Sequence, residues 1–337
     1  MSTNIGALLH AGCALLLLSA APGFAQPGSA QPGSAQPDSA QTASPEPAPA
    51  PPPAPVQPQA FKTPKEGFAA LAQSLAAHDE RRILRVLGEA GRKLIRSGDP
   101  VMDREARDRF NAAYAEKHTI VRPTADRAEL EIGADDWPLP LPMVARGGLW
   151  RFDASAGAQE LVDRRIGRNE LNTIETLRAI ADAQAEYAAT VGRQGAFRAY
   201  ARRFISQPGS RDGLFWETAP GEPESPLGPL VADASKGGYG HASSGKPRPF
   251  HGYLFRMLDK QGASAPGGAM DYVVNGRLIG GFAVIAWPAQ YANSGYKTFI
   301  VNHDGIVWES DLGPNTAREA DAIKAFDPNE KWHKLPE

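Results

Sequence analysis

Apolar residues recur at helical spacing directly after residue 60. Thr63 precedes Pro64 and Glu66, which is the pattern of a helix N-cap followed by a proline at the first helical position and an acid at the third. Two further helices are predicted, one from Asp79 and one from about Val101. The apolar stripe of the first helix consists of Phe68, Leu71 and Leu75.

Shorter apolar runs follow these helices and predict strands over residues 128–132, 141–145 and 149–153. Gly147-Gly148 separates the last two strands and indicates a hairpin turn. Helices followed by a small antiparallel sheet predict an α+β domain over residues 61–156.

Residues 157–191 carry the strongest helical pattern in the chain. Glu160 and Arg164 are spaced for an ion pair on the exposed face of this helix. Gly167 predicts a kink or a break into two helices. The apolar stripe comprises Ile166, Leu171, Ile174, Leu177, Ala181, Ala188 and Val191.

Residues 205–250 are rich in proline and glycine and predict a long loop. Strands dominate after it, with turns at Asn275-Gly276 and His303-Asp304-Gly305. A long helix followed by an antiparallel meander makes residues 157–337 a second α+β domain. The predicted strands cover residues 251–258, 278–287, 297–302 and 306–308.

The start of the chain predicts export. Residues 1–25 resemble a secretory signal peptide, because a short apolar core leads to the small residues Gly23 and Ala25. We expect cleavage after Ala25, a periplasmic or secreted product, and no transmembrane segment in the mature chain. Residues 26–60 repeat Gln-Pro-Gly-Ser-Ala and end in a proline run, which predicts a disordered linker.

Composition excludes several kinds of chemistry. Cys13 is the only cysteine and lies inside the signal core, so the mature chain is expected to lack thiol nucleophiles, thiolate zinc sites and disulfides. Lys and Arg number 36 and Asp and Glu number 38, without a basic stripe, which argues against a nucleic-acid partner. The histidines have no H-x-H or H-x-x-x-H spacing, so no metal site is predicted.

One segment imitates two catalytic motifs. Gly240 to Lys246 has phosphate-loop spacing, but Pro247 stands where a magnesium-binding Ser or Thr is required. Ser243 and Lys246 have the Ser-x-x-Lys spacing of penicillin-recognising enzymes, but the adjacent prolines prevent the helix that this chemistry needs. We interpret the segment as a glycine loop and predict no cofactor.

Six residues are candidate ligand contacts. Asp135, Asp136 and Trp137 combine two carboxylates with an aromatic ring, as sugar and cation sites do, although a turn closed by Pro138 explains them as well.

The other three candidates are Arg165, Arg168 and His251. With Arg164, the two arginines place guanidinium groups along one helix where an anion could dock, and ion pairs with Glu160 and Glu170 are the alternative. His251 precedes a strand beside Gly252, in a position that suits either a functional group or a packed or capping histidine.

Several segments after the linker carry a family resemblance. They are Ser97-Gly-Asp-Pro-Val101, Asp135-Asp136-Trp137-Pro138, Trp150-Arg-Phe-Asp153, Arg165-Ile-Gly-Arg-Asn-Glu170, Ser225-Pro-Leu-Gly-Pro-Leu230, Tyr272-Val-Val-Asn-Gly276, Gly280-Gly281-Phe282, Thr298-Phe-Ile-Val-Asn302 and Asp311-Leu-Gly313. On these segments the chain resembles the family called domain of unknown function 2950, found in secreted bacterial proteins. The family has no assigned catalytic residue, so the resemblance implies no activity.

A second, fold-level resemblance concerns residues 158–310. An amphipathic helix containing Ala183-Gln184-Ala185-Glu186-Tyr187, then a variable loop and a meander, is similar in layout to the soluble part of type IV pilins and pseudopilins. True pilins begin with a long apolar assembly helix that this chain lacks, so the resemblance concerns the fold and not a filament.

These observations favour an exported, non-enzymatic protein that binds an unknown small molecule or an envelope protein. The sequence contains no nucleophile–base pair, so no catalytic residue is assigned. The alternative is a periplasmic hydrolase that uses dispersed carboxylates and His251 in an inter-domain cleft. That alternative requires the His251 ring to hydrogen-bond to a carboxylate inside a pocket.

Overall fold

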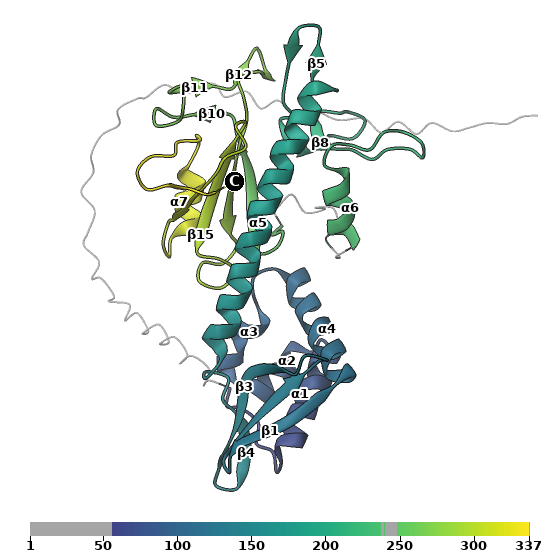
Figure 1. Cartoon of the computed structure of the whole chain (residues 1–337), viewed down its shortest axis with the longest axis vertical. Helices are drawn as coiled ribbons and strands as arrows, with labels where there is room; N and C mark the ends of the chain where they lie inside the picture. Colours follow the sequence, from purple (N-terminus) through teal and green to yellow (C-terminus); the bar gives the residue numbers. More distant parts are fainter. Residues whose placement is uncertain (1–55, 237–238, 240–247, 337) are drawn as a thin grey trace, which may run out of the picture. The chain divides into compact units, whose positions relative to one another are not determined.

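The computed structural model describes residues 56–236, 239 and 248–336 (Figure 1). The predicted signal peptide, residues 26–55 of the predicted linker and the Gly240–Lys246 segment lie outside these residues. Ordered contacts begin before Phe61, because Glu89 N–H donates to the carbonyl of Val56 at 2.8 Å and Gln59 N–H donates to that of Arg85 at 2.9 Å.

The predicted N-terminal helices are present. Helix α1 (Pro64–Ala76) starts at Thr63, whose hydroxyl accepts from Glu66 N–H at 3.3 Å, and α2 (Glu80–Leu87) starts at Asp79, whose carboxylate accepts from Arg82 N–H at 3.0 Å. Two short elements that we did not predict follow, the 3₁₀ helix η1 (Glu89–Gly91) and α3 (Arg92–Ile95). Helix α4 covers Pro100–Glu116.

An antiparallel sheet follows in the order β1-β2-β3-β4 (Figure 1). The strands are β1 (His118–Thr124), β2 (Arg127–Ile132), β3 (Trp137–Arg146) and β4 (Leu149–Phe152). Strand β1 was missed because none of its residues is buried, so it lacks apolar alternation. Strand β3 starts four residues before the predicted limit, since its prolines obscure the pattern.

Helix α5 (Ala158–Ala189) is continuous over 32 residues. It passes through Gly167 without a break, so the predicted division into two helices does not occur. A Cβ at Gly167 would meet nothing within 4 Å, and this glycine therefore faces open space on the helix surface.

A second antiparallel sheet has the strand order β17-β16-β15-β14-β9. Helix α5 packs on β14, β15 and β16, and α7 (Thr316–Ala322) packs on β14. This cover explains why the central strands are buried almost throughout. The strands are β9 (Tyr253–Leu258), β14 (Ala283–Pro288), β15 (Lys297–Asn302), β16 (Val307–Asp311) and β17 (His333–Lys334).

Two predicted strands differ from those in the structure. His251 and Gly252 have φ values of 49° and 78°, so extended structure starts only at Tyr253. The predicted strand over 278–287 is two strands, because Gly281 has a φ of 145° and interrupts it. Its first part is β13 (Arg277–Leu278), which pairs with β12 (Val273–Val274) across the predicted Asn275-Gly276 turn.

The predicted loop over 205–250 contains regular structure in its described part. Strand β7 (Arg203–Ile205) pairs with β8 (Gly213–Phe215) in parallel, and α6 covers Gly228–Lys236. Two small hairpins complete the fold: β5 (Arg193–Gln194) with β6 (Phe197–Arg198), and β10 (Lys260–Gln261) with β11 (Met270–Asp271).

The fold is therefore α+β, as predicted, with helices and antiparallel sheets segregated along the chain. Apolar residues form two cores, one built from residues 61–161 and the other from residues 174–335. Within the described ranges, no helix has the length and apolar character needed to cross a membrane.

Candidate ligand-binding site

A cavity of about 550 Å³ lies beside the first hydrophobic core. Its lining comes from α1, α3, α4, β3, the turn between β2 and β3 and the first part of α5, with one residue each from α2 and β2. Small-molecule pockets typically have volumes of roughly 300–1,000 Å³, so the cavity is large enough for a ligand. The apolar side chains of the wall include Leu75, Ile95, Met102, Phe110, Leu139 and Leu161.

The apolar face of α4 is only partly covered by the rest of the protein. Met102 is the only buried residue among the 17 of this helix. Ala106, Phe110 and Ala113 follow it at helical spacing and line the cavity. Phe110 and Ala113 pack on the first core but are only partly buried, and Ala106 is exposed, so the cavity leaves this stripe partly open. An apolar occupant would complete its burial.

Charged side chains surround this apolar wall. The lining contains five arginines and three acids, so positive charge exceeds negative charge by two when the acids are ionised. The arginines are Arg107, Arg109, Arg164, Arg165 and Arg168, and the acids are Asp103, Glu116 and Asp135.

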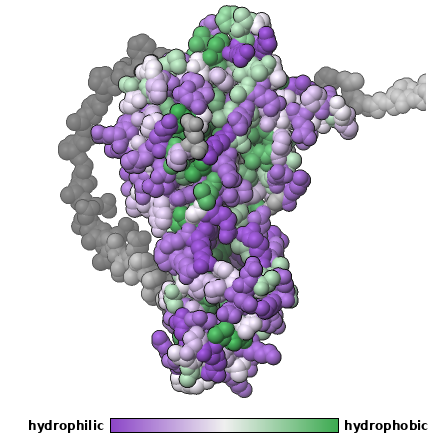
Figure 2. All heavy atoms as spheres, in the orientation of Figure 1, coloured by the Kyte–Doolittle hydropathy of each residue, from purple (hydrophilic) through white to green (hydrophobic). Residues whose placement is uncertain are grey.

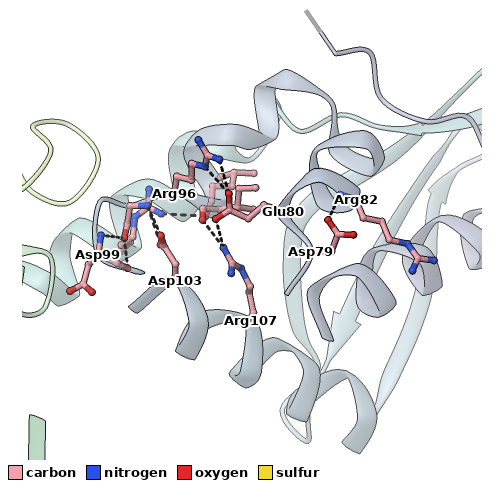
Figure 3. Close-up of polar contacts among 11 residues, drawn as sticks. Asp79, Glu80, Arg82, Arg96, Asp99, Asp103 and Arg107 are labelled. Carbon is pink, nitrogen blue, oxygen red and sulfur yellow. Dashed lines mark hydrogen bonds and ion pairs between the residues drawn. The ribbon is translucent and has the colours of Figure 1, made fainter. Parts of the chain in front are cut away.

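Three of the five arginines have carboxylate partners. Arg107 lies 3.5 Å from Glu80, which also binds Arg96 at 2.7 Å (Figure 3). Arg109 pairs with Glu105 at 3.2 Å. These side chains already have carboxylate partners within the protein, which leaves them less free to bind an anion.

Arg164 makes two contacts at the cavity. It forms the predicted ion pair with Glu160 and lies over the Trp137 ring, with the guanidinium carbon 5.2 Å from the ring centroid. The cation–π contact holds Trp137 at the cavity and fixes one side of its wall.

Arg165 has neutral partners in place of the expected carboxylate. Its Nε donates to the carbonyl of Asn293 at 3.0 Å, and its Nη groups donate to the carbonyls of Leu94 at 3.3 Å and Lys93 at 2.9 Å, and to the Asn293 side chain. Glu170, one of the two acids considered as ion-pair partners of the helix arginines, instead accepts from the N–H groups of Tyr296 and Lys297. Of the five N–H donors of a guanidinium, one on Nη1 stays available.

Arg168 is the remaining arginine. It is exposed, one helical turn from Arg164, and makes no hydrogen bond or ion pair with any residue in the described part of the chain. All five of its donors are therefore available at the edge of the cavity. Arg165 and Arg168 together place two guanidinium groups without carboxylate partners at one apolar pocket.

Asp103 is the lining acid that interacts electrostatically with Arg165 and Arg107. Its carboxylate accepts from Ser97 N–H at 3.0 and 3.2 Å (Figure 3). Burial raises the pKa of Asp103 above its usual value, while that hydrogen bond and the positive charges of Arg165 and Arg107 oppose the rise. Burial likewise lowers the pKa of Arg165, which Asp103 partly offsets. Asp103 therefore gains a proton more readily than an exposed aspartate.

The cavity brings together four of the six residues singled out from the sequence. Asp135, Trp137, Arg165 and Arg168 all line it. Asp136 does not: it has a φ of 51° and pairs with Lys117 at 2.7 Å, as expected for a turn residue.

His251 lies outside this cavity. Its backbone N–H donates to the Tyr239 hydroxyl at 3.2 Å, and that hydroxyl donates to buried Asp99 at 2.8 Å. The ring packs on Phe250, with centroids 4.1 Å apart. Burial lowers the pKa of His251, although Asp99, Glu105 and Glu175 act in the opposite direction. Within the described residues, Nδ1 is buried without a hydrogen-bond partner, and the ring bonds to no carboxylate.

Sequence reasoning missed the contribution of α4 to the site. The signal was present, because Met102, Ala106, Phe110 and Ala113 repeat at intervals of three and four residues. That periodicity identifies an apolar face but does not say whether another element covers it.

The comparisons with known proteins agree with the family resemblance. The sequence profile described as "Protein of unknown function (DUF2950)" matches residues 58–335. The chain belongs to the DUF2950 family. Neither the curated proteins nor the solved structures contain a significant match, so the similarity of this DUF2950 protein to pilins is not confirmed.

Proposed function

We propose that this DUF2950 protein is an exported, non-enzymatic binding protein for small amphipathic acids. The apolar body of the ligand would occupy the 550 Å³ cavity, and its acidic head would bind Arg168 and the free donor of Arg165. One observation carries the proposal: an open apolar pocket holds two guanidinium groups that lack carboxylate partners.

The apolar part of the proposal rests on α4. The side chains after Met102 face the cavity, and transfer of apolar surface from water stabilises a complex by about 25 cal/mol per Å². A ligand that covers Ala106, Phe110 and Ala113 would contribute this term without any rearrangement of the fold.

The charged part rests on Arg168 and on the free donor of Arg165, since the other three arginines of the lining already have carboxylate partners. A carboxylate, sulfate or phosphate head would be a charged acceptor for these donors, whereas a neutral head would offer them only a weak acceptor. The preference for an acid over the corresponding alcohol is therefore the signature of the site.

Export is the second element of the proposal. It is supported by the apolar core that ends at Gly23-Phe24-Ala25 and by the proline-rich segment that follows. The hydrolase alternative, with dispersed carboxylates and His251, receives no support from the described contacts of the His251 ring.

Dodecanoate and dodecanol test the proposal as a matched pair of ligands. We expect dodecanoate to raise the melting temperature in a saturable way and to bind at least about tenfold more tightly than dodecanol in calorimetric titration, because a hydrogen bond to a charged group contributes roughly 1.5–3 kcal/mol.

Three variants locate the binding. Ala106→Trp should block the cavity and abolish the effect, and Arg168→Gln should weaken dodecanoate about tenfold while leaving dodecanol unchanged. Arg81→Gln, at an exposed α2 position outside the cavity, is the control and should behave as wild type. Equal binding of acid and alcohol, or full binding by Ala106→Trp, would show that the site is elsewhere.

A further inference from the structure

Two small hairpins lie side by side at the end of α5. The β5–β6 hairpin contacts the β12–β13 hairpin through Arg277, whose Nη1 donates to Gln194 Oε1 at 2.7 Å. Arg202 donates to the carbonyl of Gly276 at 3.1 Å, and Tyr200 forms an isolated bridge with Leu278. These contacts hold the two hairpin tips next to each other (Figure 1).

Both tips expose apolar side chains. Phe197 is 65% exposed and Val274 is 47% exposed. Phe197 pairs across its hairpin with Gln194, and Val274 pairs with Arg277. Cross-strand partners lie on the same face of a hairpin. Because Gln194 and Arg277 hydrogen-bond to each other, Phe197 and Val274 lie on either side of this hydrogen bond.

The same region carries positive charge that the described protein does not balance. Arg193 and Arg198 are direct cross-strand partners, and neither forms an ion pair with a described residue. Like charges in this arrangement destabilise a hairpin unless an anion lies between or above them. Arg202 and Arg277 donate only to neutral oxygens.

The nearby acids do not offset these four arginines. Asp212 pairs with Arg203 at 3.0 Å. Asp182 and Glu186, on the last turns of α5, and Asp271, at the end of β11, make no ion pair with any of the four. In Figure 2, hydrophobic and hydrophilic residues adjoin at the end of the view where Figure 1 places β5.

We propose that these hairpin tips dock on the surface of a bilayer that contains anionic phospholipid. Phe197 and Val274 would enter the headgroup region, and Arg193, Arg198, Arg202 and Arg277 would bind lipid phosphates. Aromatic and apolar side chains beside arginines are suited to the membrane–water interface, because the apolar groups can enter the acyl boundary while the guanidinium groups stay hydrated among the lipid headgroups. Neighbouring apolar tips flanked by arginines fit the fluid, anionic surface of such a bilayer.

Co-sedimentation with vesicles tests this proposal. The chain from Gln26 onward is used, because the apolar run in residues 14–18 would itself bind lipid. We expect binding to vesicles of phosphatidylcholine with 30% phosphatidylglycerol at 0.1 M salt, and little binding to phosphatidylcholine alone. Binding should fall at 1 M salt, where screening reduces the attraction of the arginines.

Paired variants identify the surface. Arg193→Glu combined with Arg198→Glu should lower the partition coefficient by more than about tenfold, because each basic residue near an anionic membrane contributes several-fold. Arg81→Glu combined with Arg104→Glu makes the same change in net charge at exposed helical positions and should bind like wild type. Phe197→Ser should weaken binding about tenfold and leave its salt dependence intact.

All these side chains are exposed, so we expect every variant to fold, and its melting temperature checks this. Equal loss in the two charge-reversed pairs would show that net charge alone drives binding and would overturn the proposal. Binding to soluble heparin without binding to anionic vesicles would overturn it as well, in favour of a polyanion site.

Discussion

Replacing Asp99 by alanine should destabilise the protein far more than the loss of an ordinary helix cap. Asp99 is 1% exposed, and one carboxylate oxygen caps α4 by accepting from the N–H groups of Val101 at 3.1 Å and Met102 at 3.3 Å. Its other oxygen accepts from the Tyr239 hydroxyl at 2.8 Å and from Gly252 N–H at 2.9 Å. A single buried carboxylate therefore joins α4 to two distant segments.

The magnitude follows from these four bonds. Loss of an N-cap costs about 1 kcal/mol, and each buried donor left without its charged acceptor costs about 1–3 kcal/mol. Asp99→Ala should therefore lower the free energy of unfolding by about 4 kcal/mol. Asp79→Ala is the control, because Asp79 caps α2 through Arg82 N–H and has no distant partner in the described chain (Figure 3). It should cost about 1 kcal/mol.

Tyr239→Phe completes the test as a double-mutant cycle. Burial and the adjacent Asp99 carboxylate raise the pKa of the Tyr239 hydroxyl, so it stays protonated and acts as a donor. Tyr239→Phe alone should cost about 2 kcal/mol, and much less when Asp99 is already alanine.

Urea denaturation, followed by circular dichroism and by tryptophan fluorescence, measures these differences in the free energy of unfolding. The two unfolding curves must coincide, because the free energies are defined only for two-state unfolding. Equal costs for Asp99→Ala and Asp79→Ala, or additive effects of the Asp99 and Tyr239 substitutions, would refute the argument that the carboxylate joins distant segments.

Three further predictions concern packing, pH and the N-terminal region. Gly295→Ala should lower the free energy of unfolding by about 2–3 kcal/mol, because the added Cβ would lie 2.0 Å from the Tyr253 hydroxyl. Gly276→Ala should cost only about 1 kcal/mol in the same urea assay, because a Cβ there meets open space and only the φ of 74° is unfavourable. The pKa of Asp103 is raised in the folded state, so its protonated form stabilises the fold. The free energy of unfolding of wild type, relative to that of Asp103→Asn, should therefore be greatest below pH 3.8 and should fall as the pH rises from 3.8 through the raised pKa. A difference that stays constant over this pH range would contradict the prediction. Deleting residues 26–55 should leave the melting temperature unchanged, since their sequence has no apolar periodicity, and a fall of several degrees in calorimetry would show otherwise.

Local patterns predicted much of the fold. The caps at Thr63 and Asp79, the long helix over residues 157–191 and the Asn275-Gly276 turn depend on residues a few positions apart, and their residue types suffice to identify them. Strand β1 was not predictable in this way, because a strand without buried residues has no apolar alternation.

The candidate site shows where local reasoning ends. The sequence by itself determined which side chains carry suitable chemistry, and it singled out Asp135, Trp137, Arg165 and Arg168 without placing them together. It also offered Glu160 and Glu170 as partners for the arginines of this helix, on the ground that opposite charges near each other on one helix tend to pair.

Only the tertiary structure decided which of these groups stay unpaired. Arg165 finds its acceptors 71 to 128 residues away in the chain, and Glu170 finds its donors 126 and 127 residues away. The folded chain likewise leaves the apolar face of α4 open beside Arg168. Hydrogen bonding and burial depend on distances in space, and a periodic sequence pattern records only distances along the chain.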